Sequence, residues 1–312
     1  MSGVDFEIAA PPIGFMSADV GSDLRELDAD AVIFGAPHGT PYDGIDNRVH
    51  EGAPDALRQS LEEDARWADH WNFDFDGTVF GNRGFKLADL GNLKTAPLDG
   101  AGNREKIEAV VRAIRKRGAV PIMIGGDDSV PIPFIAGFSG SGPVTIVQVD
   151  AHIDWREERR GEPLGFSSTM RRASEMDHVD RIIQIGMRGI GSAREGEVIY
   201  AQDWGAEIVT AREIHTHGIG AALKHLPEGA DCIFTIDCDA LDPAEMPAVM
   251  APTPGGLTYT QVIELIGGVI DKANLIGFDL IEFVPGRDPS GVAAYTGAHV
   301  ICNAIGGLAR RK

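Results

Sequence analysis

The chain has 312 residues, of which 47 are acidic and 28 are basic, so its formal net charge is −19. A surface this acidic repels phosphates and anionic lipid headgroups, which disfavours a nucleic-acid-binding or membrane-surface protein. It attracts cations instead, such as metal ions or a positively charged small substrate.

The sequence also indicates the cellular compartment of the protein. We expect no membrane-spanning segment, because no apolar run approaches the roughly 20 residues that a spanning helix needs. The N-terminus has no basic region followed by an apolar one, so no secretory signal is expected. The three cysteines, Cys232, Cys238 and Cys302, form no CxxC pair, and a sparse, odd number fits a reducing compartment. A cytoplasmic location is therefore predicted.

Alternating strand and helix patterns run along most of the chain. Residues 1–28, punctuated by Pro and Gly, are predicted to form an N-terminal arm. Strands are expected within residues 31–37, 85–91, 119–126, 144–152, 181–189, 206–210, 231–239 and 275–283. Helices are expected within residues 53–67, 103–118, 192–203, 218–225, 260–272 and 293–310. Apolar strands alternating with helices predict a three-layer α/β/α fold with a mostly parallel central sheet, in a single domain over residues 1–312.

Several predicted strands end in carboxylates that apolar packing does not explain. Asp150, His152 and Asp154 alternate along one strand end, and Asp237 and Asp239 alternate along another. An extended backbone points such alternating side chains to one side. Converging carboxylates repel one another unless cations neutralise them. Carboxylates with an imidazole suit Mn²⁺, Ni²⁺ or Zn²⁺, and there are enough of them for two ions that together activate a water.

Other readings exist for the weaker motifs. Aspartates often end strands as turn formers or helix caps, which is the expected role of Asp242 before Pro243 and a possible role of Asp127. Asp279 and Glu282 follow the same strand-end pattern. Three ionisable groups on one strand face, however, rarely serve packing, so the metal interpretation is favoured over the structural one.

The motifs GGDDS (125–129), DAHID (150–154) and DCDALDP (237–243) resemble the signature blocks of the ureohydrolases, the family of arginase and agmatinase. The resemblance extends along nearly the whole chain, through GAPHGTPYDG, EGAPDALR, ADLGNL, IQIGMRG and IGFDLIEFVPGRDPSG, and the agmatinase branch is the most similar. It implies an arginase-like fold and hydrolysis of a guanidino compound to urea and an amine by a metal-bridging hydroxide. It also implies two divalent ions, with Mn²⁺ usual and Ni²⁺ an alternative.

The resemblance also implies roles for individual residues. Asp150 and Asp237 match the carboxylates that bridge the two ions. His152 and Asp239 match ligands of one ion, and Asp154 matches a ligand of the other. We expect Asp154 to act in catalysis as well.

Glu282 matches the glutamate that holds the substrate guanidinium and is the second expected catalytic residue. Ser129 is expected to shape its turn, since no base is paired with it. The implied partners are a small cationic guanidino substrate and further copies of the chain in a trimer or hexamer.

Two residues depart from the family pattern. Asp128 stands where GGDHS has a metal-binding histidine, which gives the expected ligand set five carboxylates against four positive charges. A shared proton, a changed metal preference or a weak site would each account for this. Phe166 stands where a histidine usually shuttles protons or contacts substrate, and Phe cannot move protons. A more apolar pocket fits guanidine, an alkylguanidine or a biguanide, with Phe166 and Trp155 as substrate contacts, although Trp155 could equally belong to the core.

The same departures allow a different function, a catalytically impaired subunit that assembles with an active paralogue. A formiminoglutamase-like activity is a third possibility. His38 or His50 could replace the missing histidine or be ordinary loop residues. His215 and His217 are expected in a surface loop, and Cys238 in the core.

Overall fold

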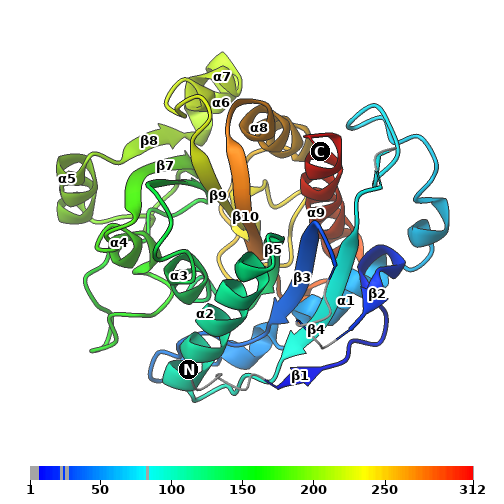
Figure 1. Ribbon diagram of the computed structural model, residues 1–312. Coiled ribbons are helices and arrows are strands. Elements are labelled where there is room, and N and C mark those ends of the chain that lie inside the picture. Colours follow the sequence, from blue (N-terminus) through cyan, green and yellow to red (C-terminus); the bar gives the residue numbers. More distant parts are fainter. Residues whose placement is uncertain (1–6, 22–23, 25–27, 82–83, 312) are drawn as a thin grey trace.

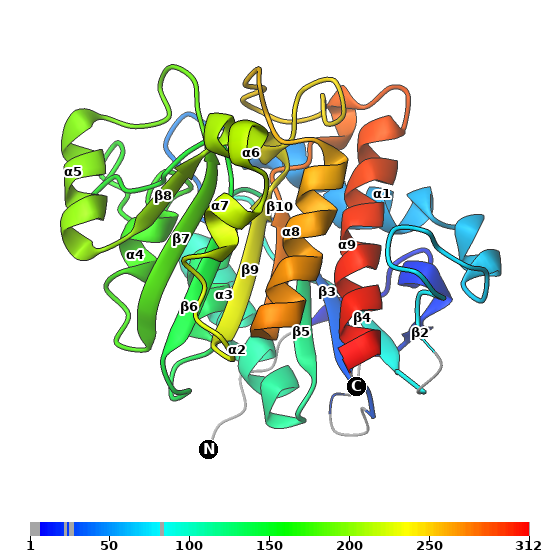
Figure 2. The ribbon, with the colours of Figure 1, turned by 90° about the horizontal axis from the view of Figure 1, so that it is seen from above.

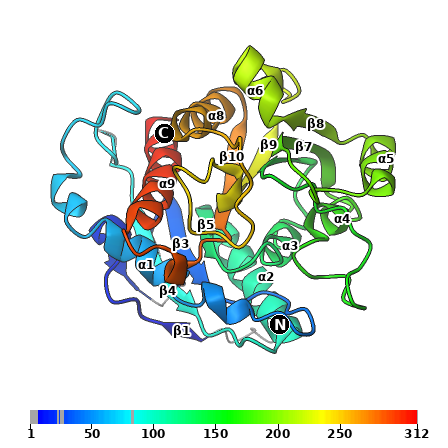
Figure 3. The same ribbon diagram turned by 180° about the vertical axis from the view of Figure 1, so that it is seen from behind.

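The computed structural model describes residues 7–21, 24, 28–81 and 84–311. A ten-stranded sheet runs through the molecule, with strand order β1-β4-β3-β5-β10-β9-β6-β7-β8 and with β2 paired to β4. The strands are β1 (Ile8–Ala9), β2 (Asp19–Val20), β3 (Ala31–Ala36), β4 (Leu87–Leu93), β5 (Val120–Gly125), β6 (Val144–Val149), β7 (Val179–Met187), β8 (Glu207–Thr210), β9 (Asp231–Asp237) and β10 (Asn274–Ile281). All described pairings are parallel except that of β1 with β4, and Figures 1 and 3 show β1 and β8 near opposite edges.

Helices cover both faces of the sheet. They are α1 (Ala53–Ser60), α2 (Gly100–Lys116), α3 (Pro131–Ala136), α4 (Thr169–Ala173), α5 (Glu195–Trp204), α6 (Ala211–His217), α7 (Gly220–Leu223), α8 (Tyr259–Lys272) and α9 (Val292–Arg311). Five short 3₁₀ turns lie at Phe15–Ser17, Asn47–His50, Asp64–Trp67, Cys238–Ala240 and Pro285–Arg287. Figure 2 shows α8 and α9 in front of the sheet and α2 and α3 behind it. The predicted three-layer fold with a mostly parallel sheet is confirmed.

Alternation along the strands divides the apolar side chains between two cores. In β5, Ile122 and Ile124 join the core that contains α1, α8 and α9. Met123, between them, joins the core that contains α2, α3 and α4. Successive side chains point to opposite faces of a strand. This is why buried central strands are apolar throughout, while their ends are free to carry polar groups.

Some helices differ from the sequence expectation. The helix expected over 53–67 ends at Ser60, and a separate 3₁₀ turn begins at Asp64. Three acidic residues, Glu62, Glu63 and Asp64, follow the end of α1, where the helix dipole disfavours negative charge. The short helices α3, α4 and α6 were not predicted. A capping box of Thr210 and Glu213 starts α6.

The predicted N-terminal arm contributes to the sheet. Residues 1–6, 22–23 and 25–27 of this arm lie outside the described residues, but its described part forms β1 and β2, which both pair with β4. The expectation that no segment could span a membrane needs one correction. By length and composition α9 could do so, but 72% of its most apolar window is buried. That burial is typical of the core helix of a globular protein.

Candidate active site

The four central strands end at the same edge of the sheet and carry the predicted site residues there. β5, β10, β9 and β6 are consecutive neighbours in the sheet. Asp128 follows β5, Glu282 follows β10, Asp237 ends β9, and Asp150 follows β6. In parallel sheets this carboxyl edge is where ligands bind. The fold therefore brings together residues that lie as many as 154 positions apart.

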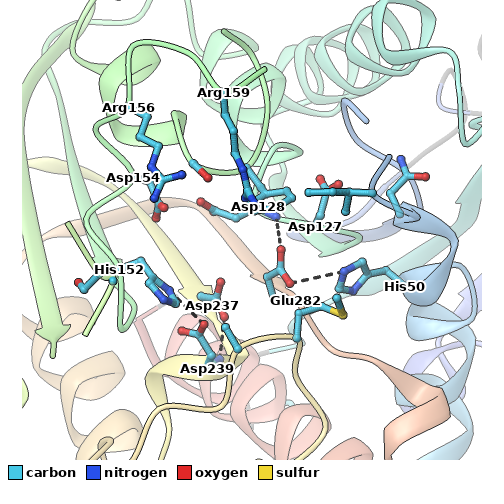
Figure 4. Close-up of a pocket in the computed structure, with 18 of the residues that line it drawn as sticks. His50, Asp127, Asp128, His152, Asp154, Arg156, Arg159, Asp237, Asp239 and Glu282 are labelled. Carbon is cyan, nitrogen blue, oxygen red and sulfur yellow. Dashed lines mark hydrogen bonds and ion pairs between the residues drawn. The ribbon is translucent and has the colours of Figure 1, made fainter. Parts of the chain in front are cut away.

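Three of these four side chains, those of Asp128, Asp237 and Glu282, line one cavity of about 220 Å³ (Figure 4). Its lining includes most of the expected site residues, namely Asp128, His152, Asp154, Trp155, Phe166, Asp237, Asp239 and Glu282. Asp150 is 1% exposed and is not among the lining residues. The predicted substrate and metal residues are thus neighbours in the structure.

Two groups of possible ligand atoms share Asp150. One group is Asp150, His152 and Asp239, and the other is Asp128, Asp150 and Asp154. Within each group the ligand atoms lie within 4.8 Å of one another. His152 Nδ1 is 3.1 Å from Asp239 Oδ2 and 3.4 Å from Asp150 Oδ1. This grouping places Asp150 between the two positions where ions would bind, and it includes Asp128.

Asp237 takes a different position from the other bridging candidate. It belongs to neither group of described residues. Its Oδ1 accepts a hydrogen bond from the backbone N–H of Asp239 at 2.7 Å, as the cap of the 3₁₀ turn that follows β9. Asp237 therefore orients Asp239 directly, and its role as a bridging ligand stays a prediction.

The residues present suit divalent cations. Burial and the charges of neighbouring carboxylates raise the pKa values of Asp128, Asp150 and Asp237 well above the ordinary range. Burial alone would lower the pKa of His152, but its hydrogen bonds to Asp150 and Asp239 and their negative charges raise it to about 11. Asp128 Oδ2 is buried without a hydrogen-bond partner among the described residues. Keeping these buried carboxylates ionised is costly without counter-ions, and one of their oxygens has no hydrogen-bond partner. Both features fit divalent ions that would neutralise the cluster.

A chain of buried amides fixes two of these carboxylates. Gln148 Nε2, at the end of β6, donates to Asp150 Oδ2 at 2.8 Å and to Asp154 Oδ2 at 3.0 Å. Gln148 Oε1 accepts from Gln184 Nε2 at 2.5 Å, and Trp155 Nε1 donates to Gln184 Oε1 at 2.7 Å. Each amide is thereby held in one orientation. Trp155 is 1% exposed, so its ring lies mainly in the core while its Nε1–H supports this chain.

An unusual backbone conformation orients the side chains of two site residues. Asp154 and Glu282 have positive φ values of 52° and 66°, a region that residues other than glycine rarely adopt and that often marks functional positions. The backbone N–H of Glu282 donates to the carbonyl of Gly126 at 2.8 Å. A Cβ on Gly126 would lie 2.5 Å from the carbonyl oxygen of Pro37, so glycine is required at this close approach.

Glu282 is held beside the ligand groups by two contacts. Its Oε1 accepts from the backbone N–H of Asp128 at 2.9 Å, and its Oε2 is 3.5 Å from His50 Nε2. Burial raises the pKa of Glu282 to about 7, with His50 opposing the shift. His50 Nδ1 lies 3.1 Å from the carbonyl of Phe283, which it can reach as a donor. A buried glutamate of this kind attracts a cationic group.

The remaining histidines lie elsewhere. His38 is buried with its Nδ1 2.9 Å from Thr95 Oγ1, and it does not line the cavity. His215 and His217 lie in α6 rather than in the expected surface loop. They are exposed at the end of that helix, and His215 contacts the carbonyl of Gly255 and Gln261. Of the two histidines considered as replacements, the structure brings only His50 to the cavity.

Other singled-out residues have structural roles. Asp127 Oδ1 accepts from the N–H and hydroxyl of Ser129, and Ser129 Oγ accepts from the N–H of Thr40 at 2.6 Å. Asp242 accepts from three backbone N–H groups, as a turn residue does. Cys238 is fully buried in a core cluster.

Several residues of the site were not anticipated. The pattern of acidic residues at strand ends, which predicts the ligands, does not include Gln148, Gln184 or Arg188. Arg188 donates to the carbonyls of Gly186, Asp239, Ala240, Leu241 and Thr253. It thus anchors the turn that carries Asp239. Its place in the IQIGMRG block was the available signal. Arg156 and Arg159 also line the cavity, and nothing in the sequence placed them there.

Comparison with known proteins identifies the family. A model described as arginase family matches residues 29–306. A guanidinobutyrase from Pseudomonas aeruginosa is 31% identical over 221 residues, which is 69% of each chain. A human mitochondrial guanidino acid hydrolase is 28% identical over 311 residues, 95% of this chain and 83% of that protein. The structure of proclavaminate amidinohydrolase from Streptomyces clavuligerus superposes with a TM-score of 0.83 at 24% identity, covering 97% of this chain and 99% of that one. The chain therefore belongs to the arginase family and is a hydrolase of the type that acts on C–N bonds of linear amidines.

Proposed function

We propose that the protein hydrolyses a guanidino compound with water, giving urea and an amine. The observation that carries this proposal is the pair of ligand groups sharing Asp150 beside Glu282 in one cavity. The balanced reaction consumes one water molecule per guanidinium. The guanidinium carbon ends in urea, and the substituted nitrogen ends as the ammonium group of the amine product. The named relatives, a guanidinobutyrase and a guanidino acid hydrolase, support this class of substrate.

Two divalent ions are part of the proposal. The ligands would be Asp150 with His152 and Asp239 for one ion, and Asp150 with Asp128 and Asp154 for the other, with Asp237 as a further bridging ligand. When bound, such ions would lower the pKa of a water molecule and so supply the nucleophile for hydrolysis at neutral pH. Mn²⁺ is expected from the family resemblance, and Ni²⁺ is the alternative if Asp128 changes the metal preference.

The protein's own groups position the substrate. Glu282, fixed by the N–H of Asp128, would hold the guanidinium by charge-assisted hydrogen bonds, and a bound cation would favour its ionised form. His50 Nε2 lies beside the second Glu282 oxygen, where it would donate the proton that the leaving amine needs. His50 would in this way substitute for the histidine that Phe166 replaces.

The second candidate is a catalytically impaired subunit that assembles with an active paralogue. Its motivation is the pair of departures at Asp128 and Phe166. The grouping of Asp128 with Asp150 and Asp154 supports the catalytic proposal instead, since a carboxylate at that position can still bind metal. Assembly into trimers or hexamers stays a prediction from the family resemblance.

The test is product release by the purified chain loaded separately with Mn²⁺ and with Ni²⁺. Metal content is verified first, and urea is measured with agmatine, guanidine, 4-guanidinobutyrate, an alkylguanidine and a biguanide. Urea from at least one substrate, lost in Glu282→Gln, is expected. Formamide from a formimino substrate, without urea from any guanidino compound, would contradict the proposal. No turnover alone but turnover with an added paralogue would favour the second candidate.

A further inference from the structure

We propose that Arg159 forms a carboxylate-binding subsite in the cavity, and that the preferred substrate is therefore a guanidino acid. The proposal rests on the proposed function in that it uses the same cavity. Arg159 lines that cavity together with Glu282 (Figure 4). A substrate with a guanidinium at one end and a carboxylate at the other would meet a fixed anion and a fixed cation.

The Arg159 guanidinium has no anionic partner of its own. No hydrogen bond or ion pair reaches it from the part of the chain that the structure describes, although its side chain is half-buried. The neighbouring arginines differ in this respect. Arg156 Nε lies 3.7 Å from Glu197 Oε1, and Arg160 donates to the carbonyl of Asp43. Arg159 is thus the arginine of this segment whose planar, five-donor fork is available to a ligand.

Two aromatic rings hold Arg159 in place. Its guanidinium carbon lies 5.2 Å from the centre of the Tyr42 ring and 5.4 Å from that of Phe166. These rings pack edge to face with centroids 4.7 Å apart. Tyr42 is 2% exposed, and its hydroxyl accepts from the N–H of Ser167 at 3.1 Å. A guanidinium on aromatic faces keeps its donors in its plane free, so the rings fix the cation without using its hydrogen bonds.

This platform gives Phe166 a physical role. The sequence alone predicts that Phe166 makes the pocket more apolar, which fits guanidine, an alkylguanidine or a biguanide. In the structure it forms half of the support for a cation. Burial and the nearby charges of Arg156 and Arg160 lower the pKa of Arg159, which is the direction expected for a cation that lacks an anion. A bound carboxylate would supply that anion.

Charge distribution favours the same orientation of substrate. The floor of the cavity is acidic, and the chain carries a net charge of −19. A carboxylate on the substrate would be repelled by these acidic residues unless a cation elsewhere in the cavity offset the repulsion. Arg159 supplies the cation, and Glu282 receives the guanidinium. A wholly cationic substrate such as agmatine would instead place its ammonium group near Arg159, which is unfavourable.

The experiment compares two ligands that differ only in the carboxylate. The affinities of 4-guanidinobutyrate and of propylguanidine are measured by calorimetry on the metal-loaded chain, as Kd, and as KM wherever urea is released. The variants are Arg159→Met, Arg159→Lys and, as a matched control that removes one positive charge from an adjacent residue outside the cavity lining, Arg160→Met. Circular dichroism and metal content verify that each variant is folded and loaded.

We expect Arg159→Met to weaken 4-guanidinobutyrate at least tenfold and propylguanidine less than twofold. Arg159→Lys should retain part of the difference, because it keeps the charge and loses the bidentate fork. Arg160→Met should change both ligands less than twofold. Equal weakening of both ligands by Arg159→Met, or no weakening of the acid, would overturn the proposal.

The result separates this inference from the proposed function. Selective, Arg159-dependent binding of the acid without urea release would leave the subsite standing and count against hydrolysis. Urea release from propylguanidine, with no preference for the acid, would leave hydrolysis standing and refute the subsite.

Discussion

At the scale of single residues, Asp128 and Gln148 make this ligand cluster different from a simple set of convergent acids. Asp128 adds a carboxylate with an unpartnered buried oxygen to the group of Asp150 and Asp154. Gln148 donates to both of those carboxylates and so offsets part of their repulsion. The excess negative charge is therefore managed by the protein's own dipoles as well as by the expected ions.

Replacing Asp128 tests whether it is a ligand. Asp128→His removes one negative charge from the ligand set and restores the residue usual in the family, for which Mn²⁺ is the expected metal, so the preference should shift toward Mn²⁺. The measurement is the metal content of protein equilibrated with equal Mn²⁺ and Ni²⁺. Asp127→Asn is the control, because it also removes a charge but from outside both ligand groups. Indifference of metal content and activity to Asp128→His would show that Asp128 does not bind metal.

Replacing Gln148 tests the positioning of the carboxylates. Gln148→Leu removes two donated hydrogen bonds while keeping the side chain's approximate size. Loss of a partner that orients ligands typically costs about 10–100-fold in metal affinity. Competition with a chelator measures that affinity, and Thr145→Val, a buried change at the other end of β6, is the control. Unchanged affinity in the folded variant would exclude a positioning role.

At the scale of elements, a buried ion pair fastens α1 to β4. Arg58 and Asp89 are both fully buried, with Arg58 Nε 2.7 Å from Asp89 Oδ2 and Nη2 2.9 Å from Oδ1. The N–H groups of Phe15 and Gly91 donate to the same carboxylate at 2.9 and 2.8 Å. These contacts join the blocks EGAPDALR and ADLGNL: one supplies the cation and the other supplies the anion.

Removing one partner of this pair should destabilise the fold strongly. Arg58→Met leaves the Asp89 charge buried without its cation, which typically costs about 3–5 kcal/mol. Urea denaturation measures the change in the free energy of unfolding. The double variant Arg58→Met/Asp89→Asn removes the buried charge and keeps an acceptor oxygen for the N–H groups, so it should recover part of the loss. Arg48→Met, which breaks an exposed pair with Asp46, should cost at most about 1 kcal/mol. A loss in Arg58→Met no larger than that of the exposed pair would contradict this account.

A second buried acid, Asp279 in β10, should make stability depend on pH. Burial raises the pKa of Asp279 to about 8, and the hydroxyl of Thr235, 2.7 Å from its Oδ1, lowers it only in part. The folded chain then keeps a proton that the unfolded chain releases above about pH 4. Its stability contribution should fall as pH rises from about 4 to 8, by up to about 1.4 kcal/mol per pH unit. Asp279→Asn should lack this slope in urea denaturation, and parallel pH profiles of the two proteins would exclude it.

The sequence predicts the elements well and the side-chain network poorly, for physical reasons. Strands such as residues 144–149 can be predicted from their continuous apolar composition, and alternation predicts that the acids at their ends point to one side. Short helices such as α3 and α4 contain too few turns for periodicity to reveal them. Gln148 donates to Asp150, two positions along its own chain, but also bonds Gln184 on the neighbouring strand, and Arg159 meets Tyr42 from a distant segment. Such contacts depend on tertiary packing, which no local pattern records.

At the scale of the whole molecule, the acidic residues behind the net charge of −19 lie in different surroundings. Most of the acidic residues lie on the surface, where water solvates them. A smaller set, half-buried at Asp154 and buried otherwise, converges at the carboxyl ends of β5, β6 and β9: Asp128, Asp150, Asp154, Asp237 and Asp239. Bound cations would cancel most of that charge, and Arg159 would add a positive pole at the cavity. The fold thus turns an overall acidic chain into a cavity with two poles, suited to a zwitterionic guanidino acid.

The metal stoichiometry of the purified chain tests the central claim most directly. Native mass spectrometry, with elemental analysis to identify the metal, should find two divalent ions per chain. Asp150→Ala should lose both ions, because Asp150 belongs to both ligand groups, whereas Asp154→Ala should lose one. A wild-type chain that binds at most one ion under saturating metal, or an Asp150→Ala variant that still binds two, would contradict the account.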